Sequence, residues 1–141
     1  MKILFLSPGW PKGRLWGELG FKFPTLSLAS LAAVTPPAWE VAFHDDAIRA
    51  TDLASDADLI ALTAMTAQAN RAYQLADAFR SRGKTVVMGG FHASNLPDEA
   101  LQHVDSVVVG EGELVWPQLL ADFQAGRLQR IYRADGLIDT A

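Results

Sequence analysis

The sequence predicts an α/β fold in which helices cover both faces of a parallel sheet. Five short apolar runs of strand length alternate with stretches that show helical periodicity or helix-capping residues. Several of these runs are unbroken rather than alternating, as expected for strands that are buried on both faces. Strands that alternate with helices form right-handed βαβ units, and such units build a parallel sheet.

The predicted elements follow one another in a regular order. Strands are predicted over residues 3–6, 39–43, 59–62, 85–88 and 107–109. A helix over residues 25–34 stops before two prolines, and a helix over residues 69–82 ends at Gly83, a residue type favoured just beyond helix C-termini. The second helix places a buried face on Ala69, Ala72, Tyr73, Ala76 and Phe79.

Two further helices are indicated near the end of the chain. Pro97-Asp98-Glu99 is typical of a first helical turn, because proline fits there and acids suit the positive end of the helix dipole. In a helix over residues 113–123, Pro117 must lie in the first turn or produce a kink.

Five strands of this kind favour a three-layer, doubly wound sheet of the flavodoxin-like (Rossmann-like) type, with strand order 2-1-3-4-5. Ligands of such sheets bind outside the carboxyl ends of the strands, near the point where the strand order reverses. That point lies between strands one and three. The loops after Leu6, Leu62, Met88 and Val109 are therefore expected to carry the function.

Composition narrows the function classes. A chain of 141 residues fits one domain, and its net charge of −4 gives no reason to expect nucleic acid or a membrane surface as partner. The chain has no cysteine, which excludes disulfides, thiolate zinc sites and iron–sulfur clusters held by these residues. No apolar run approaches the roughly 20 residues that span a bilayer. A cytoplasmic location is expected.

The four loops are rich in glycine and in small hydroxylated residues. Glycine lets the backbone approach a ligand closely, and hydroxyl groups supply neutral hydrogen bonds. The candidate ligand-binding residues are Ser7, Pro8 and Gly9 after strand one, Thr63, Met65 and Thr66 after strand three, Gly89, Gly90, Phe91 and His92 after strand four, and Gly110, Glu111 and Gly112 after strand five.

This ordered set of loops resembles the amino-terminal cobalamin-binding domain of class B (cobalamin-dependent) radical S-adenosylmethionine enzymes, from Met1 to about Phe123. The strongest marks are Gly89-Gly90-Phe91-His92 with Pro97-Asp98-Glu99, and the run Asp105-Ser106-Val107-Val108-Val109-Gly110-Glu111-Gly112-Glu113. A supporting mark is Phe23-Pro24-Thr25-Leu26-Ser27-Leu28, which leads to Leu31-Ala32-Ala33.

The resemblance implies that the corrin ring lies across the carboxyl ends of the strands while the nucleotide tail enters a slot beside the sheet. Thr63 and Met65 stand where related domains have a Ser-x-Leu element along that slot, and Gly89 and Gly90 stand at a glycine pair that leaves the tail room. A Gly90→Val substitution is therefore expected to block binding and to leave the fold intact.

Methionine synthase and mutase domains carry a cobalt-ligating histidine after strand one, but here no histidine precedes His44. Bound cobalamin is therefore expected to be base-off and without a histidine ligand.

The resemblance also implies a division of the parent protein. Residues 1–126 form the cobalamin-binding domain, and residues 127–141 form a linker towards a radical S-adenosylmethionine domain. That domain holds a 4Fe-4S cluster through Cys-x-x-x-Cys-x-x-Cys, so a chain without cysteine lacks it. An excised amino-terminal domain is favoured over a natural stand-alone one.

The chain is expected to be a non-catalytic module of a parent methyltransferase. Its expected partners are cobalamin and the radical S-adenosylmethionine domain of the same parent. The alternative is an interaction domain of the same fold that has lost cobalamin binding. A flavin or nucleotide domain is disfavoured because no hydroxyl-rich phosphate loop follows strand one.

Several residues keep two interpretations. His92 either approaches the corrin or is a turn residue bonded to backbone. The aromatic residues of the first loop either cover a ligand or another domain, or pack beneath the loop; they are Trp10, Trp16, Phe21 and Phe23. Glu111 and Glu113 could form a carboxylate pair but equally suit the start of a helix.

Other candidates are assigned structural roles. Trp39 and Trp116 are expected in the core, and His44 and His103 are expected to be structural. Asp45-Asp46 is interpreted as a turn or helix cap. The acidic pocket of a receiver domain needs an aspartate after strand three, where this chain has Thr63.

Overall fold

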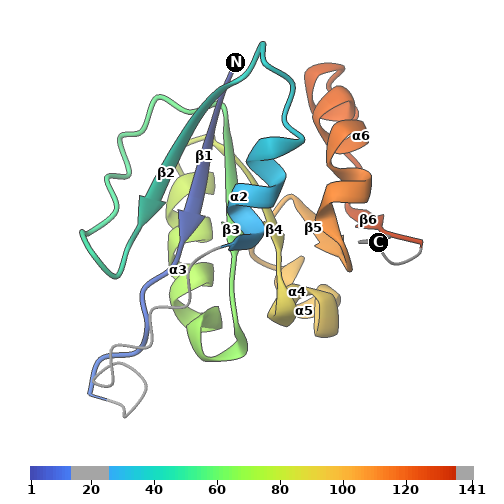
Figure 1. Cartoon of the computed structure of the whole chain (residues 1–141). Helices are drawn as coiled ribbons and strands as arrows, with labels where there is room; N and C mark the ends of the chain where they lie inside the picture. The colour runs from blue at the N-terminus through green and yellow to red at the C-terminus, as the bar shows by residue number, and fades with distance from the viewer. Residues whose placement is uncertain (14–25, 136–141) are drawn as a thin grey trace.

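The computed structural model describes residues 1–13 and 26–135, which form a six-stranded parallel sheet between two layers of helices (Figure 1). The strands are β1 (Lys2–Ser7), β2 (Glu40–Asp45), β3 (Leu59–Thr63), β4 (Thr85–Gly89), β5 (Ser106–Val109) and β6 (Ile131–Arg133). Every neighbouring pair is parallel, and the order is β2-β1-β3-β4-β5-β6. The predicted α/β class and the order 2-1-3-4-5 of the first five strands are confirmed.

The register of the sheet aligns the carboxyl ends of the central strands. Leu6 of β1 pairs with Leu62 of β3, and Thr63 of β3 pairs with Gly89 of β4. The loops that follow these strands therefore leave the sheet at the same edge, where a ligand can touch several of them.

Helices cover the two faces unequally. The face covered by α3 (Ala69–Arg80), α4 (Phe91–Asn95) and α5 (Pro97–Ala100) has its own apolar core, and η1 (Thr66–Gln68) leads into α3. The opposite face is covered by α2 (Leu26–Ala33) and α6 (Gly112–Gln124) and has a second core. Residues 46–58 join β2 to β3 without a helix.

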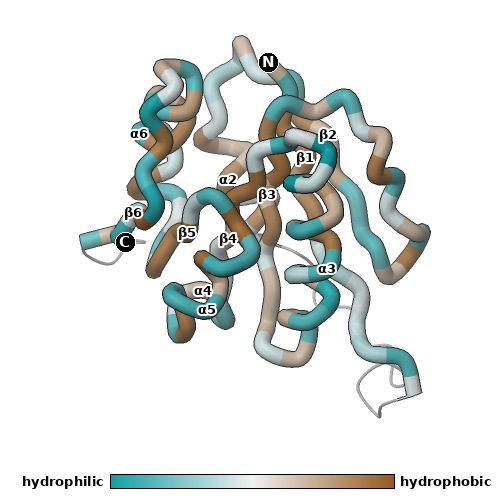
Figure 2. The backbone as a smooth tube through the Cα atoms, turned by 180° about the vertical axis from the view of Figure 1, so that it is seen from behind, coloured by the Kyte–Doolittle hydropathy of each residue, from teal (hydrophilic) through white to brown (hydrophobic). Residues whose placement is uncertain are grey.

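Alternate strand residues belong to different cores, because successive side chains of a strand point to opposite faces. Ile60 and Met88 pack on the α3 face, whereas Ala61 and Val87 pack on the α2 and α6 face. The central strands β1, β3 and β4 are coloured hydrophobic along most of their length in Figure 2, in agreement with burial on both faces. The edge strand β2 is only partly buried.

Most helical predictions are confirmed. Helix α3 begins at Ala69 and buries all five residues of its predicted face, and Gly83 beyond it has a φ of 75°. Helix α5 begins at Pro97, and Trp39 and Trp116 are buried. Pro117 lies inside α6, in its second turn rather than its first.

The predicted strand count is wrong by one, because β6 lies within the segment expected to be a linker. Residues Ile131–Arg133 pair with β5, and Tyr132 is only 4% exposed within the core beneath α6. A strand of three residues shows no measurable periodicity. Its place in the sheet depends on pairing with β5 and on one tyrosine that packs beneath the preceding helix α6. The remainder of the linker assignment stays a prediction.

Some expectations concern residues outside the described ranges. They include Trp16, Phe21, Phe23, the start of the supporting mark at Pro24-Thr25, and residues 136–141 of the linker. Within the described ranges, no helix has the length and apolar character needed to cross a membrane.

Candidate ligand-binding site

A pocket of about 120 Å³ lies between the sheet and the helices α2 and α6. This volume is somewhat below the about 150 Å³ of an apolar protein cavity that accommodates benzene, so the pocket can enclose part of a ring system that enters from its open side. It is lined by residues of α2, of three neighbouring strands and of the turn that starts α6: Ser27, Leu28, Leu31, Ala61, Leu62, Thr63, Val87, Gly89, Gly90, Val108, Gly110, Glu111, Gly112, Glu113 and Trp116.

The pocket exists because the strand residues that form its floor are small. Ala61 and Thr63 of β3 and Gly89 of β4 belong to the face covered by α2 and α6. On the opposite face the same strands carry larger side chains, such as Ile60 and Met88, which fill the core beneath α3. The hollow is therefore encoded in alternate residues near the strand ends.

The two glycines after β4 have different roles. Gly90 has a φ of 92°, and a Cβ there would lie 2.6 Å from the Thr63 hydroxyl and 3.1 Å from the Ala64 nitrogen. The turn itself thus requires glycine at position 90. Gly89 has no such constraint, since its Cβ would meet Val108 at an ordinary 3.6 Å. The room for a ligand comes from Gly89.

Close contact between α2 and α6 limits the pocket on its outer side. A Cβ at Gly112 would lie 3.2 Å from a methyl group of Leu31, so glycine lets α6 start close against α2. The hydroxyl groups of Ser27 and Thr63 are 3.5 Å apart at the carboxyl ends of the strands. Further along the strands the lining is apolar, with Val87 among it. The pocket therefore combines an apolar interior with two hydroxyl-bearing residues, Ser27 and Thr63, and two acidic residues, Glu111 and Glu113.

Six predicted site residues line this pocket: Thr63, Gly89, Gly90, Gly110, Glu111 and Gly112. Seven do not: Ser7, Pro8, Gly9, Met65, Thr66, Phe91 and His92. Met65 and Phe91 are exposed at the carboxyl edge, at 45% and 60%. Sequence reasoning missed the α2 wall and the inward strand residues. The available signal was the alternation of side chains between the two faces of each strand. It identifies the pocket residues only together with the knowledge of which helix covers which face.

His92 is directed away from the pocket, onto the α3 side of the sheet. Its ring is almost fully buried, with Nε2 2.9 Å from the Tyr73 hydroxyl and 3.1 Å from Glu99 Oε1. Its Nδ1 lies 3.3 Å from the Thr66 hydroxyl. Both ring nitrogens thus have side-chain partners, and the imidazole ties α4 to the loop after β3, to α3 and to α5.

The other two histidines also have partners within the protein. Nε2 of His44 lies 2.8 Å from the Arg49 carbonyl oxygen, and Nδ1 of His103 lies 2.9 Å from Asp77 Oδ2. His103 also stacks on Tyr73. None of the three histidines lines the pocket.

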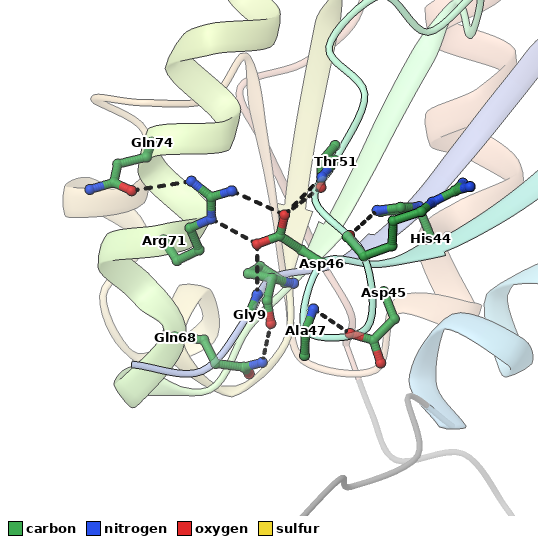
Figure 3. Close-up of polar contacts among 11 residues, drawn as sticks. Gly9, His44, Asp45, Asp46, Ala47, Thr51, Gln68, Arg71 and Gln74 are labelled. Carbon is green, nitrogen blue, oxygen red and sulfur yellow. Dashed lines mark hydrogen bonds and ion pairs between the residues drawn. The ribbon is translucent and has the colours of Figure 1, made fainter. Parts of the chain in front are cut away.

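A buried carboxylate holds the loop after β1 (Figure 3). Asp46 accepts a hydrogen bond from the Gly9 N–H at 3.2 Å, and two from the N–H and hydroxyl of Thr51 at 3.1 and 2.7 Å. Arg71 of α3 donates to both carboxylate oxygens, at 2.7 and 3.0 Å. The Asp45-Asp46 turn was predicted, and Asp45 does accept a bond from the Ala47 N–H. The role of Asp46 was not predicted.

Gln68 joins the loops after β1 and β3. Its Nε2 donates to the Pro8 carbonyl oxygen at 2.6 Å, and its Oε1 accepts from the Met65 N–H at 3.0 Å (Figure 3 shows the first bond). Ser7, Pro8 and Gly9 are therefore placed beside the β3 loop, although they do not line the pocket.

The electrostatics of Asp46 follow from these contacts. Burial tends to raise the pKa of its carboxyl group, but bonds from Arg71, Thr51 and the Gly9 N–H outweigh burial and hold that pKa well below its ordinary value. The folded pKa is thus lower than the unfolded value of about 4. The ionised carboxylate stabilises the fold at neutral pH, and this stabilisation is lost as the pH falls below the unfolded pKa.

We expect the free energy of unfolding of the unmodified chain to fall more steeply than that of Asp46→Asn between about pH 5 and about pH 2. Above about pH 5 the difference between the two proteins is expected to be constant, because Asp46 is ionised in both the folded and the unfolded state. Urea unfolding across this range measures both curves. Parallel curves throughout would contradict the assigned pKa direction.

Comparison with known proteins agrees with this geometry. The family model described as the B12 binding domain matches residues 15–120, which is more than half of the chain. The chain belongs to the B12-binding domain family. The pocket of this B12-binding domain lies inside the matched range, as do all of its lining residues.

Two curated relatives are methyltransferases of Chlorobaculum tepidum. The bacteriochlorophyllide d C-8(2)-methyltransferase is 41% identical over 112 residues, covering 76% of this chain and 24% of that protein. The bacteriochlorophyllide d C-12(1)-methyltransferase is 36% identical over 115 residues, covering 79% and 25%. The chain thus spans about a quarter of the length of these relatives.

Among solved structures, the N-terminal domain of a hypothetical protein of Thermotoga maritima aligns with a TM-score of 0.46 at 23% identity. The alignment covers 54% of this chain and 61% of that one.

Proposed function

We propose that the chain is the cobalamin-binding module of a larger radical S-adenosylmethionine methyltransferase, and that it holds base-off cobalamin at the carboxyl ends of its strands. The observation that carries the proposal is the hollow above Ala61, Thr63 and Gly89, open at the edge where three loops meet. Its apolar interior and its open side suit the partial insertion of an aromatic base on a nucleotide tail.

The surroundings of the hollow fit the corrin as well. Apolar side chains are exposed around the same edge, at the end of β3, at the start of α4 and at the starts of both pocket helices: Met65, Phe91, Leu26 and Leu114. Exposed apolar side chains at this edge favour contact with an apolar face of a ligand or of another part of the parent protein. We include both the corrin and the radical S-adenosylmethionine domain of the parent as proposed partners of this edge.

Cobalamin supplies a cobalt ion that can carry a methyl group, while the protein supplies binding and orientation. In this chain, the small floor residues receive the tail, and the hydroxyl groups of Ser27 and Thr63 offer hydrogen bonds near the opening. All three histidines have partners inside the protein, which supports a cobalt ion without an imidazole ligand.

Methyl transfer by the parent protein is supported by the names of the two relatives, and a larger parent is supported because the matched segment is only about a quarter of each relative. The radical domain is proposed for the remaining part of the parent. The binding module holds a cofactor rather than a substrate, so the substrates of the relatives are not carried over to this chain.

Titration with hydroxocobalamin, followed by its visible spectrum, tests the proposal. We expect a dissociation constant in the low micromolar range or weaker, which corresponds to about −8 kcal/mol. The bound spectrum is expected to be base-off. No spectral change at several hundred micromolar cofactor would favour the alternative, an interaction domain of the same fold that has lost cobalamin binding.

Electron paramagnetic resonance of the cob(II)alamin form reports the cobalt ligand directly. We expect cobalt lines without nitrogen triplets, both in the unmodified chain and in His92→Ala, because His92 faces the α3 side with both nitrogens engaged. Triplets that disappear in His92→Ala would show histidine ligation and overturn the base-off, histidine-free assignment.

A further inference from the structure

The Asp46 cluster connects three segments that are distant in sequence and does not touch the pocket. It joins Gly9 after β1, Thr51 in the connection after β2, and Arg71 in the first turns of α3 (Figure 3). The loop it holds lies at the carboxyl edge of the sheet, beside the loop after β3.

The cluster is built like an internal clamp rather than a surface ion pair. The Asp46 side chain is 4% exposed, and its bonds come from the loop after β1, the connection after β2 and helix α3. Arg71 binds both carboxylate oxygens, a geometry that fixes orientation as well as distance. A Cβ at Gly9 would lie only 3.1 Å from Asp46 Oδ2, so the loop backbone lies directly against the carboxylate.

The loop after β1 needs such a clamp. Pro8, Gly9 and Trp10 belong to no helix or strand, and the described part of the loop bonds to the rest of the domain through Asp46 and Gln68. A loop that is already ordered before the ligand arrives does not lose conformational freedom on binding, and affinity increases accordingly.

We propose that Asp46 and Arg71 are positioning residues for cobalamin. They hold Pro8 and Gly9 at the start of the loop after β1 in one conformation, so that this described part of the carboxyl edge is ordered before the corrin binds. This inference rests on the proposed function and adds residues that touch neither the pocket nor the cofactor.

A second arginine–aspartate pair, at the amino ends of the strands, serves as the control. Arg80, in the last turn of the same helix α3, pairs with Asp105 at 3.0 Å just before β5. Asp105 also accepts a bond from the Val86 N–H. Asp105 is 32% exposed and accepts one bond from Arg80, so Asp105→Asn and Arg80→Gln break a more exposed pair on the same helix without altering the carboxyl edge.

The experiment compares Asp46→Asn with Asp105→Asn, and Arg71→Gln with Arg80→Gln, in the 141-residue chain at a temperature where circular dichroism shows each variant folded. Amide hydrogen exchange of Gly9 is measured without cobalamin, and the dissociation constant is then measured with hydroxocobalamin. Arg71 is 42% exposed, so Arg71→Gln decides the question if Asp46→Asn does not fold.

We expect Gly9 exchange to accelerate and cobalamin binding to weaken by roughly tenfold in both cluster variants, because the loop must then be ordered on binding. Both control variants are expected to match the unmodified chain in both measurements, even where they lose equal thermal stability. A role confined to stability would instead change the melting temperature and leave the dissociation constant unaltered.

The outcomes separate the two proposals. If the unmodified chain binds cobalamin and the cluster variants bind equally well, or if Gly9 exchange is unaltered, the positioning role is overturned and the proposed function stands. If the unmodified chain does not bind cobalamin at all, the proposed function fails and the inference fails with it.

Discussion

Gly89→Val is expected to weaken cobalamin binding by about 100-fold while the fold persists, equivalent to roughly 2.7 kcal/mol. A Cβ at position 89 meets only ordinary contacts, and valine is favoured in strands, so β4 accepts the side chain. Its methyl groups lie on the pocket face, above the floor where the tail is proposed to bind. Hydroxocobalamin titration gives the affinity, and circular dichroism checks the fold.

Thr85→Val is the matched control for this substitution. Thr85 is four residues before Gly89 in the same strand, so its side chain is on the same face of the sheet. It lies at the amino end of β4 and does not line the pocket. We expect unaltered cobalamin affinity. Equal affinity in Gly89→Val would remove the hollow from the binding site and with it the observation on which the proposed function rests.

Gly90→Val is the less informative variant, contrary to the expectation from sequence. The contact of 2.6 Å with the Thr63 hydroxyl and the positive φ mean that the substitution strains the turn itself. Loss of binding in that variant would not distinguish a blocked slot from a distorted one. The expectation that it leaves the fold intact is replaced by an expectation of lower stability.

Tyr132→Ala is expected to lower the free energy of unfolding by about 3–4 kcal/mol, a large part of the stability of a small domain. The ring is buried against the core beneath α6, and its hydroxyl donates to Asp122 Oδ2 at 2.9 Å. Removing it leaves a cavity and deprives a buried carboxylate of one donor. Urea unfolding with linear extrapolation measures the change.

Tyr132→Phe separates the two contributions. It keeps the ring and removes only the hydroxyl, so we expect a loss of about 1 kcal/mol. Arg127 and Gln129 still donate to Asp122 in that variant. If Tyr132→Ala were as stable as the unmodified chain, β6 would contribute nothing to the stability of the domain. The domain would then end with α6, as expected from sequence.

The sequence allows the fold to be predicted wherever one local pattern decides the structure. The unbroken apolar runs of β1, β3 and β4 predict buried parallel strands, and the spacing from Ala69 to Phe79 predicts the inner face of α3. Glycines at strand ends predict the edge at which the pocket opens. Each of these signals lies within about a dozen consecutive residues.

The parts that were missed depend on contacts between distant residues. Asp46 and Arg71 are 25 positions apart, and no periodicity relates a turn aspartate to a helical arginine. His92 follows the glycine pair after β4, where a ligand contact is expected from the sequence. Its ring instead contacts Tyr73 of α3 and Glu99 of α5. The α2 wall of the pocket follows only once the face that α2 covers is known.

The small floor residues of the pocket and the large residues on the opposite face alternate along the same strands. Neighbouring positions of one strand are therefore under different selective constraints. If the proposed function holds, Ala61 and Gly89 are constrained by the ligand in the pocket, whereas Ile60 and Met88 are constrained by packing beneath α3. Neighbouring positions can thus drift at different rates and for different reasons. A lineage that abandoned the ligand could enlarge the floor residues and keep the other half of its core unchanged.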